Sequence, residues 1–336
     1  MKIKIILWTA LLNIYFYYKI MWDCLLKYAA KLYFKHWVIG YCQGSIREVI
    51  KSKIFPQEIK WLRINSMDHI NADPFPVRSW DGGVSILFED LALNDFYGKI
   101  YVLTLDKSLK ELTQKLLLDT KSHLSYPFTF NEDNKIFVFP ESSNDGRLSC
   151  YEYDPANYSF TFIKEILKLP LLDSTIIKYN DKYWLFGTLK GVDSNKKLYI
   201  YFSDNLFGHF TPHPKNPVKN SVTDSRPAGK FIEVDGVLYR PAQNCEKEYG
   251  ESITINKVKI LSETDFEEEP YMVISPDNLN LKNDRIFTIH TINVIDDLIV
   301  VDGLKWTFSL RNQWKYFLKN REYAKRIKEQ QINAQP

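Results

Sequence analysis

The sequence predicts an all-β protein that folds as a five-bladed β-propeller with short helical extensions at both ends. Three observations predict this fold. Aromatic residues make up 15% of the 336 residues, and aromatic side chains suit the pleated, half-buried surface of a sheet. Short apolar runs alternate with Asp-Gly and Asn-Asp turns, as in hairpins. A unit of about 50 residues recurs five times, which is the size of a propeller blade.

Each recurring unit consists of a polar residue, a short apolar strand, a turn and a second apolar strand. The units are ADPFPVRSWDGGVSILFED, SYPFTFNEDNKIFVFPES, LDSTIIKYNDKYWLFGT, SRPAGKFIEVDGVLYRPAQ and FTIHTINVIDDLIVVDG. Their leading polar residues are Asp73, Tyr126, Asp173, Arg226 and, as the weakest match, His290. A third strand follows in most units, for example GKIYVLTLD after the first. A sandwich or a solenoid is the alternative all-β fold, but a sandwich would not require the unit to recur five times.

We expect the propeller to occupy residues 36–311. Strand-like segments flank the five units at 36–42 (HWVIGYC) and 304–311 (LKWTFSLR). Pairing of these two segments would close the ring.

The two extensions, residues 1–35 and 312–336, are basic, aromatic and helix-prone. The apolar run 5–18 is too short to cross a bilayer, which takes about 20 residues, and no signal-peptide cleavage site follows it. Basic residues beside aromatic ones favour a helix on a membrane surface. A helix packed on the main domain is the alternative. We therefore expect a cytoplasmic protein, peripheral on the inner membrane face.

The composition gives little indication of other partners or cofactors. The formal net charge is +3, without a nucleic-acid-binding motif, so we expect no nucleic-acid partner. Four scattered cysteines fit reduced cytoplasmic thiols. His209 and His213 lie four residues apart in GHFTPHP, but the prolines exclude a shared helical face. We expect no metal and no cofactor, and a solvated loop at 267–269.

The repeat predicts where the polar residues converge. The first strand of each propeller blade lines the central axis. The leading residues of the units should therefore meet at one mouth of the channel, although they are far apart in sequence. The ends of the second strands should reach the same funnel, and they carry Glu89 with Asp90, Glu141, and Arg240 with Gln243.

This collection of side chains suits glycosidic-bond chemistry. Two or three carboxyl groups around one pocket supply an acid and a base or nucleophile, provided that their environments separate their pKa values. Arginines hold phosphate or carboxylate groups, which points to Arg226 and Arg240. The rings expected to stack on sugars are those of Tyr126, Tyr239 and Trp184.

Each of these residues also has a structural explanation. Asp73 can cap a turn, since it precedes a proline. Asp173 stands inside an apolar strand, where a charge needs a partner, and Arg226 can serve as that partner. Glu141 can lie exposed at the end of its strand.

The motifs ADPF, SYPF with PES, LDST with WLF, SRPAG and YRPAQNC resemble the propeller domain at the N-terminal end of plant glucosamine inositolphosphorylceramide transferases. Bacterial relatives of that domain occur alone or beside formyltransferase-like modules. The resemblance runs from about Trp37 to Leu261. It implies a five-bladed propeller related to the furanosidase clan, which includes arabinanases and invertase-like enzymes.

The resemblance implies roles for individual residues. Asp73 matches the first-blade base or nucleophile of that clan, and Asp173 matches the third-blade residue that orients the acid. The fourth-blade Glu that acts as the acid in arabinanases is absent, because Arg226 stands there. The acid would then be Glu141 or Glu89.

We therefore expect a carbohydrate-active protein of surface polysaccharide or glycolipid biosynthesis. Glycosyl transfer is favoured over hydrolysis because of the arginines and the basic ends. The expected ligand is a sugar, sugar phosphate or nucleotide sugar, with glycan-synthesis enzymes as partners. A non-catalytic glycan-binding propeller that supports a partner enzyme is the alternative, and it predicts carboxylates locked to arginines.

Overall fold

The computed structural model describes residues 32–56, 58–62 and 68–333. The chain divides into two compact units, one formed by His36–Lys305 and the other by Met1–Lys35 with Trp306–Pro336. Most of the expected N-terminal extension, residues 1–35, lies outside the described residues.

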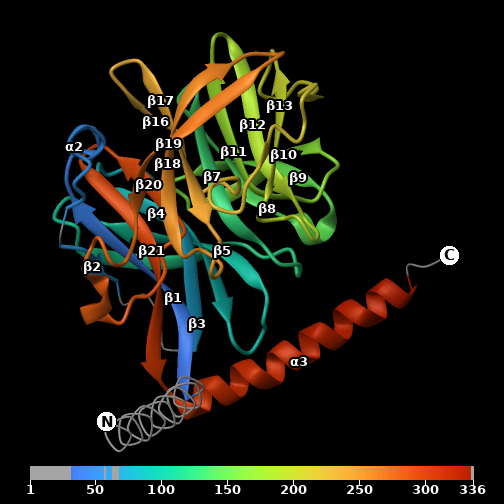
Figure 1. Cartoon of the computed structure of the whole chain (residues 1–336). Helices are drawn as coiled ribbons and strands as arrows, with labels where there is room; N and C mark the ends of the chain where they lie inside the picture. The colour runs from blue at the N-terminus through green and yellow to red at the C-terminus, as the bar shows by residue number, and fades with distance from the viewer. Residues whose placement is uncertain (1–31, 57, 63–67, 334–336) are drawn as a thin grey trace, which may run out of the picture. The chain divides into compact units, whose positions relative to one another are not determined.

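The larger unit is built from five antiparallel sheets, which are the five blades (Figure 1). Blade one contains β3 (His69–Arg78), β4 (Val84–Ala92), β5 (Gly98–Leu105) and β6 (Glu111–Leu118). Blade two contains β7 (Ser125–Glu132), β8 (Lys135–Glu141), β9 (Leu148–Asp154) and β10 (Ser159–Leu167). Blade three contains β11 (Leu171–Tyr179), β12 (Lys182–Leu189), β13 (Lys197–Ser203), β14 (Thr211–Pro212) and β15 (Lys219–Asn220). Blade four contains β16 (Ile232–Val234), β17 (Val237–Asn244), β18 (Ser252–Leu261) and β19 (Phe266–Ile274).

The fifth blade joins strands from both ends of the chain. Its order is β2 (Lys60–Trp61), β1 (Tyr33–Gln43), β21 (Leu298–Phe308) and β20 (Ile292–Ile295). The all-β five-bladed propeller is thereby confirmed, including the predicted closure of the ring. Because the closing strands pair within one sheet, the ring leaves no unpaired edge between its first and last strands.

Short helical elements complete the described chain. They are α2 (Ile46–Ser52), the 3₁₀ turns η1 (Ser143–Asp145) and η2 (Leu281–Asp284), and α3 (Leu310–Asn333).

The inner strands share one distortion. In blade one, two residues of β3, Asp73 and Pro74, oppose a single residue of β4. The same two-against-one bulge recurs at Tyr126 in β7 and at Asp173 in β11. All three leading residues adopt positive φ values, of 54°, 40° and 51°. A bulge of this kind turns a side chain out of the regular alternation of the strand, so the leading residue of each unit is re-aimed in the same way.

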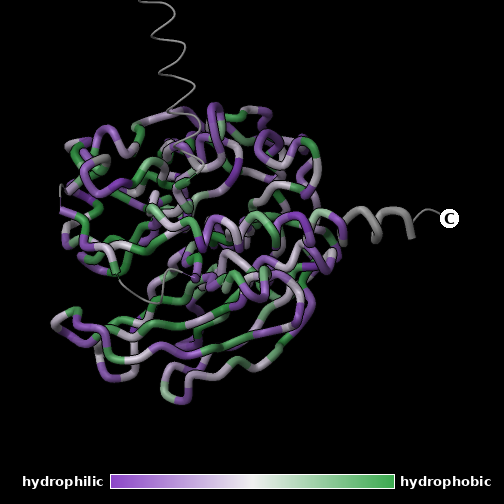
Figure 2. The backbone as a smooth tube through the Cα atoms, turned by 90° about the horizontal axis from the view of Figure 1, so that it is seen from below, coloured by the Kyte–Doolittle hydropathy of each residue, from purple (hydrophilic) through white to green (hydrophobic). Residues whose placement is uncertain are grey.

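Aromatic packing between blades forms much of the core. Phe75 of blade one meets Tyr126 and Phe128 of blade two edge-on, with ring centroids 4.8 Å and 5.9 Å apart. The three rings are at most 1% exposed. Figure 2 shows green, hydrophobic segments along the strands and purple, hydrophilic ones at many of the turns that join them. The inner strands β3, β7 and β11 are consecutive neighbours around the axis, which brings their bulges together.

The smaller unit is held together by aromatic contacts. Tyr33 lies edge-on to Phe308 at 5.8 Å, and Phe34 lies edge-on to Tyr316 of α3 at 6.1 Å. Trp314 and Phe317 stack on each other at 5.9 Å and stay largely exposed. Of the helices that are described, none is long and apolar enough to cross a membrane.

Candidate functional site

A chain of hydrogen bonds links the blades at the bulges. The backbone N–H of Asp73 donates to Asp302 Oδ2 of blade five at 2.9 Å. The N–H of Tyr126 donates to Asp73 Oδ2 at 3.1 Å, and the N–H of Asp173 donates to Glu141 Oε2 at 3.2 Å. Each bulge thus presents its N–H to a carboxyl group of the preceding blade. This arrangement explains why carboxyl groups gather here: they accept the donors that the bulges leave without a ladder partner.

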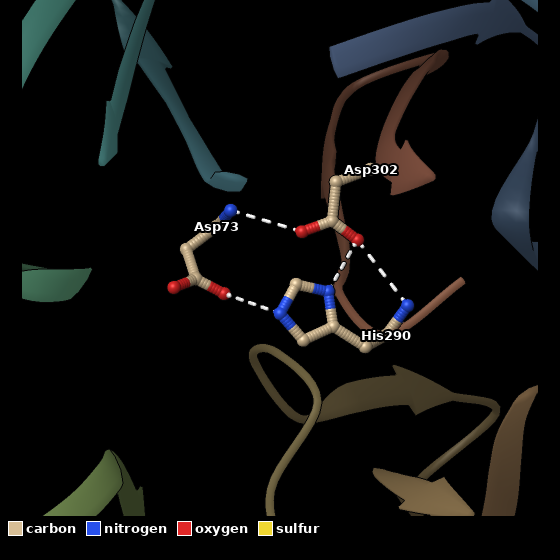
Figure 3. Close-up of side chains that lie close together, drawn as sticks. All are labelled: Asp73, His290 and Asp302. Atoms are coloured by element: carbon tan, nitrogen blue, oxygen red, sulfur yellow. Dashed lines mark hydrogen bonds and ion pairs between the residues drawn. The ribbon is translucent and has the colours of Figure 1, made fainter. Parts of the chain in front are cut away.

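Asp73, His290 and Asp302 form a buried network (Figure 3). Asp302 Oδ1 lies 2.8 Å from His290 Nδ1 and accepts the backbone N–H groups of His290 and Thr291. His290 Nε2 lies 3.5 Å from Asp73 Oδ1, and Thr291 Oγ1 donates to the same oxygen at 2.8 Å. Burial acts to lower the pKa of His290, but the negative charges of Asp302 and Asp73 outweigh it and raise that pKa.

Asp73 itself has an altered proton affinity. Burial raises its pKa to about 6, partly offset by the charge of His290. At neutral pH the carboxyl group is therefore ionised, and it keeps the proton affinity that a base requires.

Asp173 accepts hydrogen bonds from the side chains of Arg226 and Gln243. Arg226 donates from Nε to Asp173 Oδ2 at 2.5 Å and from Nη2 to Oδ1 at 3.4 Å. The Gln243 amide donates to Oδ2 at 2.7 Å. The third arm of the guanidinium donates to Asn195 Oδ1 at 3.1 Å. Arg226 therefore compensates the buried charge of Asp173, as the structural explanation of these two residues predicted.

Glu141 lies beside Asp173 and carries a raised pKa. Ser143 Oγ donates to Glu141 Oε1 at 2.9 Å, while the Asp173 N–H occupies the other oxygen. Burial and then the charge of Asp173 raise the pKa of Glu141 to about 8. Glu141 is thus protonated at neutral pH where Asp73 is ionised, which separates an acid from a base as glycosidic chemistry requires. Exposure of Glu141 at a strand end is excluded, since it is only 4% exposed.

Glu89 completes what we call the acidic ring, which consists of Asp73, Glu89, Glu141, Asp173 and Asp302. It is 8% exposed. Burial and then the charge of Asp73 raise its pKa well above the usual range. Its Oε1 lies 3.7 Å from His123 Nε2.

Aromatic side chains lie beside the acidic ring and keep more exposure. Trp37 of β1 stacks on His290 with centroids 3.9 Å apart. Tyr249, which is 41% exposed, lies edge-on to His290 at 5.3 Å. The guanidinium of Arg226 lies 5.0 Å from the Tyr249 ring centroid. These rings offer flat surfaces of the kind that sugars stack on, next to the carboxyl groups.

Three side chains of the site also have metal-ligating atoms close together. One ligand atom from each of Asp73, His290 and Asp302 lies within 4.8 Å of the others. However, all four carboxylate oxygens of the two aspartates already accept protein donors. Hydrogen bonding within the protein therefore accounts for this geometry.

Arg240 does not belong to the site, contrary to our prediction of an anion clamp. It is 1% exposed, donates to Glu268 Oε1 and Oε2 at 2.6 and 2.8 Å, and binds the carbonyl oxygens of Asp224 and Ser225. Glu268 stands in β19, so the solvated loop expected at 267–269 is wrong: these residues form a strand. These partners occupy four of the five N–H donors of a buried guanidinium, so Arg240 is held inside blade four and does not face the acidic ring.

The predicted stacking rings are also corrected. Trp184 packs between blades three and four, against Phe202, and donates to the Tyr179 carbonyl. Tyr239 packs on Tyr271 in another core cluster.

Tyr126 is fully buried, and its hydroxyl accepts the Gly229 N–H at 2.7 Å. It supports the site and does not face a ligand. Gln243 is likewise fully buried and orients Asp173.

Sequence reasoning missed four contributors to the site. Asp302 lies inside β21, in the VVDG that ends the fifth repeated unit, as Glu89 and Glu141 lie near the ends of the first and second units, so the repeat carried a signal for it. Trp37, His123 and Tyr249 come from segments outside the repeated pattern, and no spacing pointed to them.

The two histidines of GHFTPHP have different surroundings. His209 is exposed, while His213 is buried, with Nε2 3.1 Å from the Ser262 carbonyl oxygen.

Comparison with known proteins adds family relationships to this geometry. Residues 69–285 match the family described as glucosamine inositolphosphorylceramide transferase 1, N-terminal. The protein of that name from Arabidopsis thaliana is 38% identical over 158 residues, covering 46% of this chain and 21% of the relative. The one from Oryza sativa subsp. japonica is 31% identical over 205 residues, covering 59% and 27%. The chain thus spans about a fifth to a quarter of the length of these relatives.

Two solved structures with the same fold are glycoside hydrolases. A family 117 enzyme of Zobellia galactanivorans superposes with a TM-score of 0.51 at 13% identity, covering 82% of this chain and 92% of that one. A family 43 β-1,3-galactosidase gives 0.53 at 15% identity, covering 67% and 53%. At these identities the likeness establishes the propeller fold alone.

Proposed function

Because the chain belongs to the family of the N-terminal domain of glucosamine inositolphosphorylceramide transferase 1, we propose that it is a carbohydrate-active protein whose acidic ring processes a sugar. The observation that carries this proposal is the unequal proton affinity of neighbouring carboxyl groups from different blades. Asp73 has a pKa of about 6 and Glu141 of about 8. The names of the family and of the fold neighbours, which act on sugars, support the same class.

The proposed reaction is glycosyl transfer, with hydrolysis as the variant in which water is the acceptor. Asp73 serves as base or nucleophile at the anomeric centre, and a protonated carboxyl group, Glu141 or Glu89, protonates the departing oxygen. Asp173 and Arg226 form an ion pair that fixes the backbone next to Glu141. The ligand is a sugar, sugar phosphate or nucleotide sugar, with Trp37 and Tyr249 as stacking surfaces.

Replacement of the two aspartates tests this proposal. Asp73→Asn should lower turnover of the sugar substrate by about 10²–10⁴-fold, the usual contribution of a positioned acid or base. Asp173→Asn should lower turnover too, because it breaks the ion pair that fixes the backbone next to Glu141. Circular dichroism should show intact folding. Unchanged turnover in both variants would rule out the assignment.

A second candidate function is favoured by one observation. Asp173 is held in an ion pair, and Asp73 and Glu141 accept protein hydrogen bonds on both oxygens. A propeller that only binds a glycan and presents it to a partner glycan-synthesis enzyme would have such engaged carboxyl groups. It predicts saccharide binding that survives Asp73→Asn and no turnover by the chain alone.

We further propose that the protein acts at the cytoplasmic face of a membrane, in surface polysaccharide or glycolipid synthesis. The basic, aromatic ends of the chain support this location. The curated relatives above are plant proteins, so they give no support to a bacterial source.

A further inference from the structure

Two carboxyl groups are candidates for the acid, and their surroundings differ. Both oxygens of Glu141 accept hydrogen bonds, from Ser143 and from the backbone of Asp173. Among the described residues, no donor lies within hydrogen-bonding distance of Glu89. Its side chain is 11% exposed and reaches His123 Nε2 at 3.7 Å. Glu89 is therefore the carboxyl group that can turn its proton toward a ligand.

His123 is held in one tautomer by the backbone. The N–H of Gly98 donates to His123 Nδ1 at 2.9 Å, so Nδ1 must be the acceptor nitrogen. In the neutral ring the proton then sits on Nε2, which faces Glu89. Burial, assisted by the charge of Lys190, lowers the pKa of His123 to about 4. The imidazole is thus neutral at physiological pH and presents an Nε2–H.

Four nearby carboxyl groups act on Glu89 through space, and their negative charges favour its protonated form. They are Asp73 of β3, Asp90 of the same strand as Glu89, Glu141 of β8 and Asp173 of β11. Gly98 leaves the room for Glu89, because a Cβ at that position would lie 2.5 Å from Glu89 Oε1. The same glycine therefore fixes the tautomer of His123 and seats the carboxyl group beside it.

From these contacts we infer that Glu89 and His123 form the proton-donating pair of the site, with Glu89 as the catalytic acid and His123 as its positioning residue. This inference rests on the proposed function. The attacking oxygen, of Asp73 or of an acceptor that Asp73 deprotonates, bonds to the anomeric carbon as the glycosidic C–O bond breaks. The electron pair of the broken bond goes to the leaving oxygen, which takes the Glu89 proton. Glu89 becomes a carboxylate, and the Nε2–H of His123 moves within hydrogen-bonding distance to stabilise it. Glu141 then has a structural role: it accepts the N–H of Asp173 at the bulge of blade three.

The protonation states can be measured in the 336-residue chain without any substrate. Carbon-13 NMR of labelled Glu carboxyl groups and nitrogen-15 NMR of labelled His rings report them, with Glu89→Gln and His123→Gln used for assignment. We expect Glu89 to be protonated and His123 to be the neutral Nε2–H tautomer at neutral pH. A Glu89 that titrates near the ordinary value of about 4.3, or a charged His123, would overturn the pair.

Variants of His123 separate positioning from general support of the fold. His123→Leu removes the donor, so the Glu89 titration should shift to higher pH by about one unit or more. His123→Gln places an amide N–H where Nε2–H was and should restore the native titration. The exposed His209→Gln is the matched control and should leave it unchanged. An unshifted titration in His123→Leu would show that His123 does not act on Glu89.

Turnover then separates this inference from the proposed function. Glu89→Gln should lower the rate on sugars with poor leaving groups by about 10²–10⁴-fold and largely spare dinitrophenyl glycosides, which need no acid. If Asp73→Asn abolishes turnover while Glu89→Gln keeps it, the pair is wrong and the function stands. If neither variant lowers turnover, both are wrong.

Discussion

At the scale of single residues, burial decides which charged side chains hold the fold together. The side chains of Arg240 and Glu268 are each at most 2% exposed and are joined by two short hydrogen bonds. Lys219 adds a second cation, 2.7 Å from Glu268 Oε1. The attraction within a buried ion pair offsets the free-energy cost of taking both charges out of water only while both partners are present.

Removing one partner should therefore be costly. Arg240→Ala is expected to lower the free energy of unfolding by about 3–5 kcal/mol, because it leaves Glu268 buried without its main counter-ion. Urea denaturation followed by fluorescence measures the change. The exposed Arg147→Ala is the control and should cost less than about 1 kcal/mol. Equal losses in the two variants would contradict a structural role for Arg240.

The convergence of Asp73, Asp173 and Glu141 could be predicted from the sequence, because a repeat places equivalent positions together whatever residues occupy them. The partner of Arg240 could not, since it depends on the pairing of β17, β18 and β19 across one blade. Trp184 shows the same limit: strand alternation does not reveal whether a ring faces the channel or the next blade.

At the scale of elements, the bulges of the inner strands place the site. The bulge at Tyr126 is the most demanding, because positive φ is unfavourable for a bulky residue. Its hydroxyl links β7 to Thr175 of β11 at 2.9 Å and accepts the Gly229 N–H. The hydroxyl oxygen of Tyr126 thus joins β7, β11 and the segment around Gly229.

Tyr126→Phe tests this dependence. We expect a loss of about 1–3 kcal/mol in the free energy of unfolding, because the Gly229 N–H becomes a buried donor without an acceptor. Thermal and chemical denaturation both measure it. Tyr158→Phe, in the turn between β9 and β10, should change stability by less than about 0.5 kcal/mol. If Tyr126→Phe left the free energy of unfolding unchanged, the bulge would be held by its other contacts.

The helix α3 carries the proposed membrane contact. Trp314 and Phe317 are 63% and 47% exposed, and most charged residues of α3 are basic. Replacing both rings by serine should weaken co-sedimentation with phosphatidylserine vesicles at least about tenfold, since each large side chain contributes about 1.5–3 kcal/mol on burial. Trp80→Ser, at an equally exposed propeller tryptophan, is the matched control. Equal binding to purely phosphatidylcholine vesicles would contradict the electrostatic part of the proposal.

At the scale of the whole molecule, the acidic ring links stability to pH. The folded-state pKa values of Asp73 (about 6) and Glu141 (about 8) lie above the ordinary values, and that of His290 is also raised. A group whose pKa is raised by folding binds its proton more tightly in the folded state. Its stabilising contribution is complete below the unfolded pKa and is lost as the pH rises through the folded one.

The ring should therefore destabilise the protein as the pH rises from about 4 to about 8. Glu141→Gln, which cannot ionise, should flatten the fall of the melting temperature over this range. Differential scanning calorimetry at several pH values measures the effect. The exposed Glu111→Gln should leave the slope unchanged. A steeper fall in Glu141→Gln would show the reverse linkage.

The most direct test of the central claim is turnover by the 336-residue chain. Wild type and Asp73→Asn are incubated with a panel of nucleotide sugars, sugar phosphates and aryl glycosides, and the products are followed by mass spectrometry. We predict that wild type converts at least one donor, with a bell-shaped pH dependence whose lower limb lies near the pKa of Asp73, about 6. Asp73→Asn should lose that conversion. Conversion that is equal in both proteins, or none in wild type, would contradict a catalytic acidic ring.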